Sequence, residues 1–444
     1  MSEIELDSVY KIFGPQQERA RKMLDEGHTR DEVQKETGAV AAVIDASLRI
    51  GQGELFVVMG LSGSGKSTIV RMINRLFEPS AGRVTIGGTD ITGLGARELR
   101  RVRAEQISMV FQHFALMPHR TVLDNAAWGL ETRGVGTAER RERSREALQI
   151  VGLGDRVDAY PGQLSGGMKQ RVGLARALAT DAPILLMDEA FSALDPLIRR
   201  EMQDQMLDLQ ESLGKTIVFI THDLNEAMRI GDRIAVMKDG RIVQVGTAEN
   251  ILQDPANDYV ASFVQDVDRS RVLTASSVME DPRSTLGPHE GPRAAMRVMR
   301  EQQVSALFVV GPQRKLRGAV RDDAVTEAAR RDGTIDEVLI APDDLTWVTP
   351  DAPLYEILAP AAESPLPLAV VDDGRLVGVI PRVTLLAALA GEGEDSPHVS
   401  LAGSDGTGAN HDRPGGVESA SSISHLSDPP PPDLGGHAEE AAGA

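Results

Sequence analysis

The stretch Gly60-Leu61-Ser62-Gly63-Ser64-Gly65-Lys66-Ser67-Thr68 decides how this chain folds. It matches the pattern G-x-x-x-x-G-K-[ST] and directly follows Leu55–Met59, an apolar run typical of a buried strand. Glycines in such a loop let backbone N–H groups turn toward phosphate oxygens, and the helix that follows adds its positive N-terminal end. The motif predicts that Lys66 reaches the β- and γ-phosphates of a nucleotide and that Ser67 binds Mg²⁺.

Two acidic residues follow a second apolar run about 120 residues later. Asp188 ends the run Ile184–Met187, where a carboxylate can hold Mg²⁺ through water, and Glu189 beside it can polarise an attacking water. His222 follows the run Thr216–Ile220, and the carboxyl ends of core strands are where ligands of open α/β sheets gather. Each residue alone could be structural, since acidic pairs and lone histidines are common at strand ends.

A second glycine-rich stretch is Leu164-Ser165-Gly166-Gly167-Met168-Lys169-Gln170. It opens a predicted helix that runs through Arg171 to Ala179. A serine and two glycines at a helix start form another anion-binding terminus. In isolation the stretch could equally be an ordinary N-cap made by Ser165.

Composition sets the broad class of the protein. A chain of 444 residues exceeds the size at which one core stops growing, so two or more domains are expected. Its apolar runs are far shorter than the roughly 20 residues that span a bilayer, and its acidic start lacks the pattern of a secretory signal. We therefore expect a cytoplasmic protein, with which the absence of cysteine is compatible. The net charge of −19 makes nucleic acid a poor partner.

The order of patterns along the chain divides it into regions. Residues 1–265 predict a nucleotide-binding α/β unit with a mostly parallel sheet, interrupted by a helical insertion at about 15–40 and closed by a hairpin at Asp239-Gly240. Within the insertion, the apolar residues Ala20, Met23 and Leu24 are also compatible with a solvated surface helix.

The C-terminal part of the chain has a different sequence pattern from residues 1–265. Residues 272–333 and 334–390 contain two similar units, each with a strand, a turn, a glycine-containing strand and a helix, which predicts a pair packed together. Residues 391–444 are rich in Gly, Ser, Asp and Pro and carry ten acidic residues against the single Arg413. This composition predicts a disordered acidic tail.

Taken together, the motifs resemble the nucleotide-binding subunit of an ABC transporter. The resemblance implies a P-loop NTPase fold of ABC type, with a mixed β core plus a helical subdomain, and a head-to-tail homodimer that sandwiches two ATP molecules. In that dimer Ser165 and Gly167 of one copy contact the phosphate held by Lys66 of the other. The implied site elements are the Walker A loop Gly60–Thr68 (Gly60, Leu61, Ser62, Gly63, Ser64, Gly65, Lys66, Ser67, Thr68), the Q-loop and metal ligand Gln112, the signature Leu164–Gln170 (Leu164, Ser165, Gly166, Gly167, Met168, Lys169, Gln170), Walker B ending at Asp188, the catalytic Glu189, the D-loop from Ser192 to Asp195, and the switch His222.

A narrower resemblance covers residues from about 6 to 390. The stretches Val9–Gly14, Val110–His119, Glu189–Arg199 and Glu226–Arg233, with the insertion, are similar to the ATPase subunit of glycine betaine/proline importers. The C-terminal units are similar to the tandem CBS domains of that subfamily. The resemblance implies a place on the cytoplasmic face of the membrane, permease partners that the stretch from Gln112 to about Asn125 contacts, and an external solute-binding protein for betaine, proline, choline or a relative.

The nucleotide is expected to be ATP, because no Asn-Lys-x-Asp motif for guanine occurs in the chain. The family's adenine-stacking aromatic precedes the insertion, so Phe13 is the first candidate and Tyr10 the second, although either ring could belong to the core.

The CBS-like units depart from the nucleotide-binding pattern. Gly318–Asp323 and Gly378–Val383 both lack the hydroxyl residue that usually follows the glycine, and the second also lacks the aspartate. Ligand binding there is therefore in doubt, and packing or dimer contact is the alternative. We hypothesise that this region and the acidic tail sense ionic strength through contacts with an anionic membrane surface, although the tail could be an inert extension.

Other functions remain open at this stage. An importer ATPase for another small solute shares most of these motifs. A non-transport ABC ATPase acting on nucleic acid or ribosomes would usually have two cassettes or a basic surface. A regulatory module without turnover would not need Lys66, Asp188, Glu189 and His222 all intact.

Overall fold

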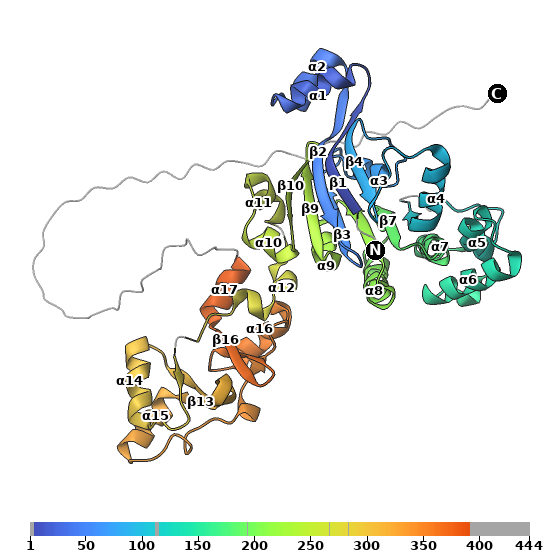
Figure 1. Cartoon of the computed structure of the whole chain (residues 1–444). Helices are drawn as coiled ribbons and strands as arrows, with labels where there is room; N and C mark the ends of the chain where they lie inside the picture. Colours follow the sequence, from blue (N-terminus) through green and yellow to red (C-terminus); the bar gives the residue numbers. More distant parts are fainter. Residues whose placement is uncertain (1–3, 112–114, 193, 266, 283, 391–444) are drawn as a thin grey trace, which may run out of the picture. The chain divides into compact units, whose positions relative to one another are not determined.

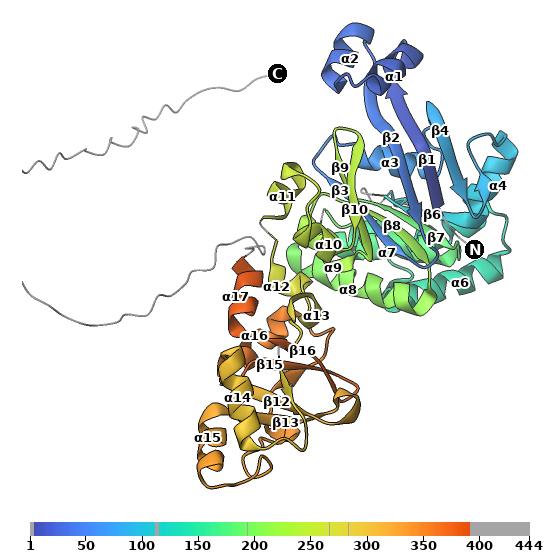
Figure 2. The ribbon, with the colours of Figure 1, turned by 60° about the vertical axis from the view of Figure 1, so that its left-hand side comes forward.

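A computed structural model describes residues 4–111, 115–192, 194–265, 267–282 and 284–390 (Figures 1 and 2). Its largest sheet has the strand order β10-β9-β3-β8-β7-β6. All neighbours are parallel except the hairpin β9–β10, which confirms the mostly parallel sheet and its closing turn. The bounds are β3 (Leu55–Gly60), β6 (Ile107–Val110), β7 (Ile184–Asp188), β8 (Thr216–Thr221), β9 (Arg233–Lys238) and β10 (Arg241–Gly246).

Strand β3 is buried along its whole length because both faces of this sheet are covered. Leu55, Val57 and Met59 belong to one apolar cluster, which includes residues of α7 and α8. Phe56 and Val58 point the other way, into a cluster shared with α3 and the second sheet. The strand carrying the phosphate loop is therefore the central element of the N-terminal region.

The second sheet is antiparallel, with the order β2-β1-β4-β5. Its strands are β1 (Ile4–Phe13), β2 (Val40–Ile50), β4 (Ala81–Ile86) and β5 (Thr89–Asp90). Between β1 and β2 the chain forms the predicted insertion, which consists of α1 (Gln17–Asp25) and α2 (Arg30–Thr37) at one end of these strands (Figure 1). Ala20, Met23 and Leu24 are buried in a small apolar cluster that they share with residues of β1 and β2, so the insertion is a packed element.

Three helices of the N-terminal region pack on one another: α5 (Val122–Thr132), α6 (Thr137–Ile150) and α7 (Gly166–Ala179). Apart from the insertion, the region also contains α3 (Lys66–Ile73), α4 (Ala96–Gln106), α8 (Pro196–Leu213), α9 (Leu224–Ile230), α10 (Ala248–Gln253) and α11 (Asp258–Val264). In the part of the chain that the structure describes, no helix is both long and apolar enough for a membrane span.

Two further three-stranded sheets form the C-terminal region. Each unit runs short strand, helix, strand, strand, helix, which confirms the predicted repeat. The units are β11 (Thr285–Leu286), α14 (Pro292–Gln302), β12 (Ala306–Val310), β13 (Leu316–Arg321) and α15 (Asp322–Arg330), then β14 (Trp347–Val348), α16 (Leu354–Glu363), β15 (Leu368–Asp372), β16 (Arg375–Ile380) and α17 (Arg382–Ala390).

The two C-terminal units pack together, as the repeat predicts. Phe308, Leu316 and Ala319 of the first share one apolar cluster with residues of β15 and β16. The short helices α12 (Arg269–Val272) and α13 (Ala275–Val278) precede the first unit, yet Ala275 and Val278 join the core of the second. The predicted acidic tail, 391–444, lies outside the described residues.

Candidate functional site

The loop Gly60–Gly65 leaves β3 and turns directly into α3, as its motif predicts. Gly65 is the N-cap of α3 with φ +105°, a conformation that glycine adopts without strain. A Cβ at this position would lie 2.3 Å from the carbonyl oxygen of Ala42 in β2. On the other side, the N–H of Gly240 donates to the carbonyl of Ser64 at 3.1 Å. The loop is therefore held between β2 and the β9–β10 turn.

Lys66 lies inside this loop and is only 5% exposed. Its Nζ donates to the carbonyl oxygens of Gly60 at 2.9 Å and Leu61 at 3.1 Å. Burial lowers the pKa of Lys66, and the carboxylates of Glu189 and Asp188 oppose that shift. The ammonium thus has backbone partners that it can exchange for phosphate oxygens.

Ser67 and Asp188 meet although they lie 121 positions apart, because α3 packs against the end of β7. The Ser67 hydroxyl donates to Oδ1 of Asp188 at 2.8 Å, and Arg71 contacts the other oxygen at 3.4 Å. Among the described residues no group of three or more His, Asp or Glu side chains could hold a metal alone. A hydroxyl and a carboxylate side by side suit Mg²⁺, which takes its remaining ligands from phosphate and water.

Glu189 and His222 face each other at the ends of β7 and β8. Nδ1 of His222 lies 3.5 Å from Oε2 of Glu189. Glu189 has φ +46°, an unusual conformation for a residue with a side chain, and such strain clusters at functional sites. Its N–H donates to the carbonyl of Ile220 at 3.1 Å, which ties the two strand ends together. The structure thus brings Lys66, Ser67, Asp188, Glu189 and His222 to one edge of the sheet.

The stretch Leu164–Gln170 forms the N-terminus of α7, as predicted. The Ser165 side chain caps the helix by accepting from the N–H of Met168 at 3.3 Å. Leu164 is anchored in the core, and Gly167 packs so closely that a Cβ would lie 2.6 Å from Cγ2 of Ile198. Within the described residues, no hydrogen bond or ion pair links this stretch to Gly60–Thr68. Its helix terminus is exposed, as an anion-binding terminus would need to be.

The D-loop residues lie beside Glu189. The hydroxyl of Ser192 donates to the carbonyl of Glu189 at 2.9 Å, and the Asp195 side chain caps α8 by accepting from Ile198 at 3.1 Å. Gln112, the expected Q-loop residue and metal ligand, lies outside the described residues. Gln170 is 1% exposed, and neither atom of its side-chain amide has a hydrogen-bond partner in the described part of the chain.

Comparison with known families agrees with this arrangement. The family described as "ABC transporter" matches residues 43–192, and the CBS domain family matches residues 337–391. The glycine betaine transport ATP-binding protein OpuAA of Bacillus subtilis is 50% identical over 88% of this chain and 93% of its own length. The chain belongs to the ATP-binding proteins of ABC transporters. Its family binds ATP and couples ATP hydrolysis to transport.

Two other relatives match this ABC ATPase with nearly the same identity, over the same share of its length. The glycine betaine/carnitine transport ATP-binding protein GbuA of Listeria monocytogenes is 49% identical over 88% of this chain and 98% of its own length. The glycine betaine/proline betaine transport ATP-binding protein ProV of Escherichia coli has the same identity and the same coverage of both chains. The similarity therefore extends well beyond the cassette into the C-terminal region.

The two aromatic candidates of this ABC ATPase differ in their surroundings. Tyr10 is 8% exposed, and its hydroxyl donates to Asp25 of the insertion at 2.7 Å. Burial, together with that hydrogen bond, raises the pKa of Tyr10 to about 12. Phe13 is partly exposed at the end of β1 and packs edge-on against Phe77, with Nζ of Lys11 4.9 Å from its ring centre. Of the two rings, that of Phe13 is therefore the more accessible.

The structure also identifies residues that the motifs did not reveal. Arg71 lies one helical turn after Ser67, a spacing that places both on the same face and that could have identified it. Arg30 of the insertion donates to the carbonyl of Gly63 in the phosphate loop at 3.3 Å. No sequence pattern marks that contact, because it joins elements 33 positions apart.

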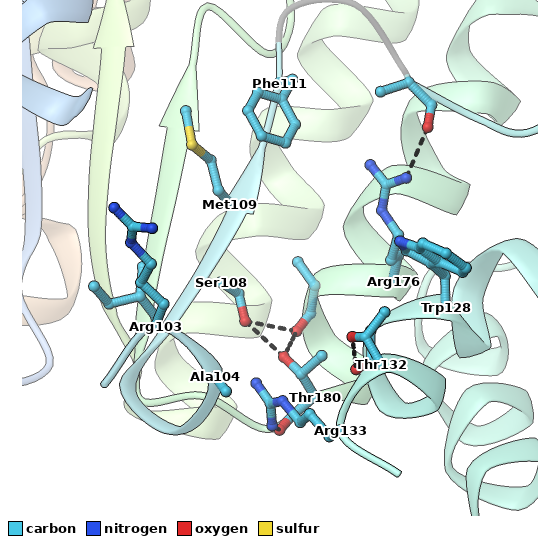
Figure 3. Close-up of a pocket in the computed structure, with 14 residues that line it drawn as sticks. Arg103, Ala104, Ser108, Met109, Phe111, Trp128, Thr132, Arg133, Arg176 and Thr180 are labelled. Atoms are coloured by element: carbon cyan, nitrogen blue, oxygen red, sulfur yellow. Dashed lines mark hydrogen bonds between the residues drawn. The ribbon is translucent and has the colours of Figure 1, made fainter. Parts of the chain in front are cut away.

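A cleft of about 450 Å³ opens between α4, β6, α5 and α7 of the ABC ATPase (Figure 3). Phe111 and Trp128 on its wall are 40% and 37% exposed. Burial lowers the pKa of each of three arginines in the same wall, and each donates to a backbone carbonyl: Arg103 to Asn74 at 2.7 Å, Arg133 to Thr180 at 2.7 Å and Arg176 to Ala115 at 2.9 Å.

Proposed function

We propose that this chain is the ATP-hydrolysing subunit of an importer for quaternary amines of the glycine betaine type. The names of the relatives support the substrate class. Three proteins named for glycine betaine transport are 49–50% identical over 88% of the chain. A trimethylamine N-oxide transport protein of Ruegeria pomeroyi is 45% identical over 75%, and the choline transport protein OpuBA of Bacillus subtilis is 37% identical over 79%, so all of these relatives are named for transport of quaternary amines or a related amine oxide. The solute itself contacts partner subunits, including an external binding protein.

The proposed chemistry assigns one task to each group at the sheet edge. Lys66 and the backbone of Gly60–Gly65 hold the phosphates, and Ser67 with Asp188 holds Mg²⁺ together with Gln112. Mg²⁺ neutralises charge on the β- and γ-phosphates when it is bound. Glu189 orients and polarises the attacking water. The contact of His222 with Glu189 at 3.5 Å supports a role in orienting both the base and the γ-phosphate.

The complete site is proposed to form between two copies. The Ser165 helix terminus is exposed and shares no hydrogen bond with the cradle of its own chain in the part that the structure describes. A helix N-terminus attracts anions, so Ser165 and Gly167 would receive the γ-phosphate bound by Lys66 of the second copy. Phe13 would stack on the adenine, since Tyr10 is buried.

The cleft in Figure 3 is proposed to receive a transmembrane partner of the transporter. It lies beside Phe111, where the stretch expected to contact the permease begins. Exposed aromatic rings and partly desolvated arginines favour a partner segment with apolar and acidic side chains. Such docking places the chain at the cytoplasmic face of the membrane as a peripheral subunit.

We further propose the domain limits 1–265, 272–333, 334–390 and 391–444. Residues 272–390, together with the acidic tail 391–444, would act as an ionic-strength sensor at an anionic lipid surface. The tail has ten acidic residues against one arginine, so an anionic surface would repel it, and added salt would screen that repulsion. Deleting 391–444 tests the tail's part. In vesicles carrying the whole transporter, the deletion should shift the salt concentration at which transport is activated. An unchanged dependence of transport on salt would show that the tail takes no part in sensing ionic strength.

The substrate class is tested by uptake. Vesicles containing the chain with its transmembrane and binding-protein partners should accumulate radiolabelled glycine betaine in the presence of ATP, and Glu189→Gln should abolish uptake. Unlabelled proline, choline and carnitine serve as competitors. Accumulation of an unrelated solute, with none of these competing, would contradict the proposal.

A further inference from the structure

Arg199, on the first turn of α8, joins the two loops that follow β7 and β8. Its Nη1 lies 3.1 Å from Oδ2 of Asp223, and its Nη2 donates to the carbonyl of Leu194 at 3.2 Å. The ion pair is largely shielded, with side-chain exposures of 27% and 33%. Leu194 belongs to the D-loop, and Asp223 directly follows His222. One guanidinium therefore bonds to both loops at once.

Both loops end in an aspartate that caps the following helix, and this fixes the geometry of the Arg199 bridge between them. Asp195 caps α8, and Asp223 caps α9 by accepting from the N–H of Glu226 at 3.2 Å. Asp223 thus uses Oδ1 for its own helix and Oδ2 for Arg199. The Arg199 side chain starts one turn inside α8, since its N–H bonds to the carbonyl of Asp195 at 2.9 Å. The planar guanidinium holds its donors in a rigid fork, so the spacing between its two contacts is fixed.

The contacts form a closed ring. From Glu189 it passes through Ser192, whose hydroxyl donates to the Glu189 carbonyl at 2.9 Å, and through Phe191, whose carbonyl accepts from the N–H of Leu194 at 3.1 Å. Arg199 then connects Leu194 to Asp223. The ring closes through His222, whose Nδ1 lies 3.5 Å from Glu189. Arg199 is the member that joins the Glu189 side of the ring to the His222 side without touching either group.

We propose that Arg199 is a positioning residue, which makes the placement of His222 against Glu189 depend on the position of the D-loop. This inference rests on the proposed roles of Glu189 and His222. When the D-loop moves as two copies approach each other, Arg199 carries that movement to Asp223 and so to His222. Hydrolysis then responds to the D-loop, while the nucleotide cradle, which contains no member of the ring, keeps its affinity.

Steady-state ATP hydrolysis by the full chain tests the proposal. Arg199→Ala should lower kcat about tenfold or more, because a displaced catalytic group costs up to roughly a hundredfold, and should leave KM within about twofold. Arg199→Lys keeps the charge but loses the fork, so it should recover part of kcat. In an Arg199→Ala background, Asp223→Asn should add little further loss, because both changes break the same bridge.

The chain offers a matched control between the same two helices. Arg229 of α9 pairs with Asp204 of α8 at 2.5 Å, away from both loops. Arg229→Ala should lower the unfolding midpoint about as much as Arg199→Ala and leave kcat unchanged. Equal losses of kcat in the two variants, an unchanged kcat in Arg199→Ala, or additive losses with Asp223→Asn would overturn the proposal.

The proposed function is checked separately with Glu189→Gln in the same preparation. If Glu189→Gln is inactive while Arg199→Ala is normal, only the positioning role fails. If Glu189→Gln hydrolyses ATP at the wild-type rate, the assignment of the base itself fails.

Discussion

Replacing Gly65 by alanine tests how tightly the phosphate loop is seated. Gly65 has φ +105°, and a strained backbone of this kind costs about 1–3 kcal/mol for a residue with a side chain. The added Cβ would also lie 2.3 Å from the Ala42 carbonyl, and overpacking of this kind costs about 1–3 kcal/mol more. We therefore expect Gly65→Ala to lower the free energy of unfolding of the cassette by about 4 kcal/mol.

Gly63 is the matched control in the same loop. Its φ of +78° is also left-handed, but a Cβ there meets no atom within 4 Å. Gly63→Ala should therefore cost only the backbone term, about 1–2 kcal/mol. Denaturant unfolding followed by circular dichroism gives both free energies, and the slope should be the same for both variants. The KM for MgATP should rise far more in Gly65→Ala, since Lys66 is the next residue. Equal destabilisation by the two alanines would refute the close approach to β2.

The remaining predictions concern both ends of the nucleotide. Phe13→Ala should raise the KM for ATP about tenfold, because stacking on a base is worth about 1–3 kcal/mol. Tyr10→Phe should leave that KM unchanged and lower the free energy of unfolding by about 1 kcal/mol, through loss of one hydrogen bond. A raised KM in Tyr10→Phe and an unchanged KM in Phe13→Ala would show that Tyr10 stacks on the adenine. Arg30→Ala should raise that KM about two- to fivefold through loss of an exposed contact with the phosphate loop. Arg19, which pairs with Glu36 in the same insertion at 3.4 Å, is its control, and an Arg19→Ala variant with an equal effect would remove the special role of Arg30.

Much of the fold was predictable because its signals are local. Apolar runs located β3, β7 and β8 to within one residue. Asp239-Gly240 located the hairpin, whose two turn residues both have positive φ, +49° and +82°. The phosphate loop and the helix after it follow from the motif itself. The repeat in the C-terminal region was visible because each unit carries the same order of strand, turn, strand and helix.

The contacts that join distant elements were not predictable from spacing. Nothing in the sequence places Arg199 between Leu194 and Asp223, because that bridge depends on how α8 and α9 pack. The choice between Tyr10 and Phe13 likewise depends on the insertion, whose Asp25 holds the Tyr10 hydroxyl. Helix α13 precedes the first C-terminal unit but packs in the core of the second, and only the tertiary structure shows this.

The mass of the Glu189→Gln variant with MgATP tests the central claim, that two copies share each nucleotide. Sedimentation should show a species of twice 47.7 kDa with ATP and the single mass without it. Adding Gly166→Asp should abolish the dimer by placing a carboxylate against the phosphate, and a Cβ at Gly166 meets no atom within 4 Å, so the fold should be kept. A single mass with ATP, or a dimer that survives Gly166→Asp, would contradict the shared site.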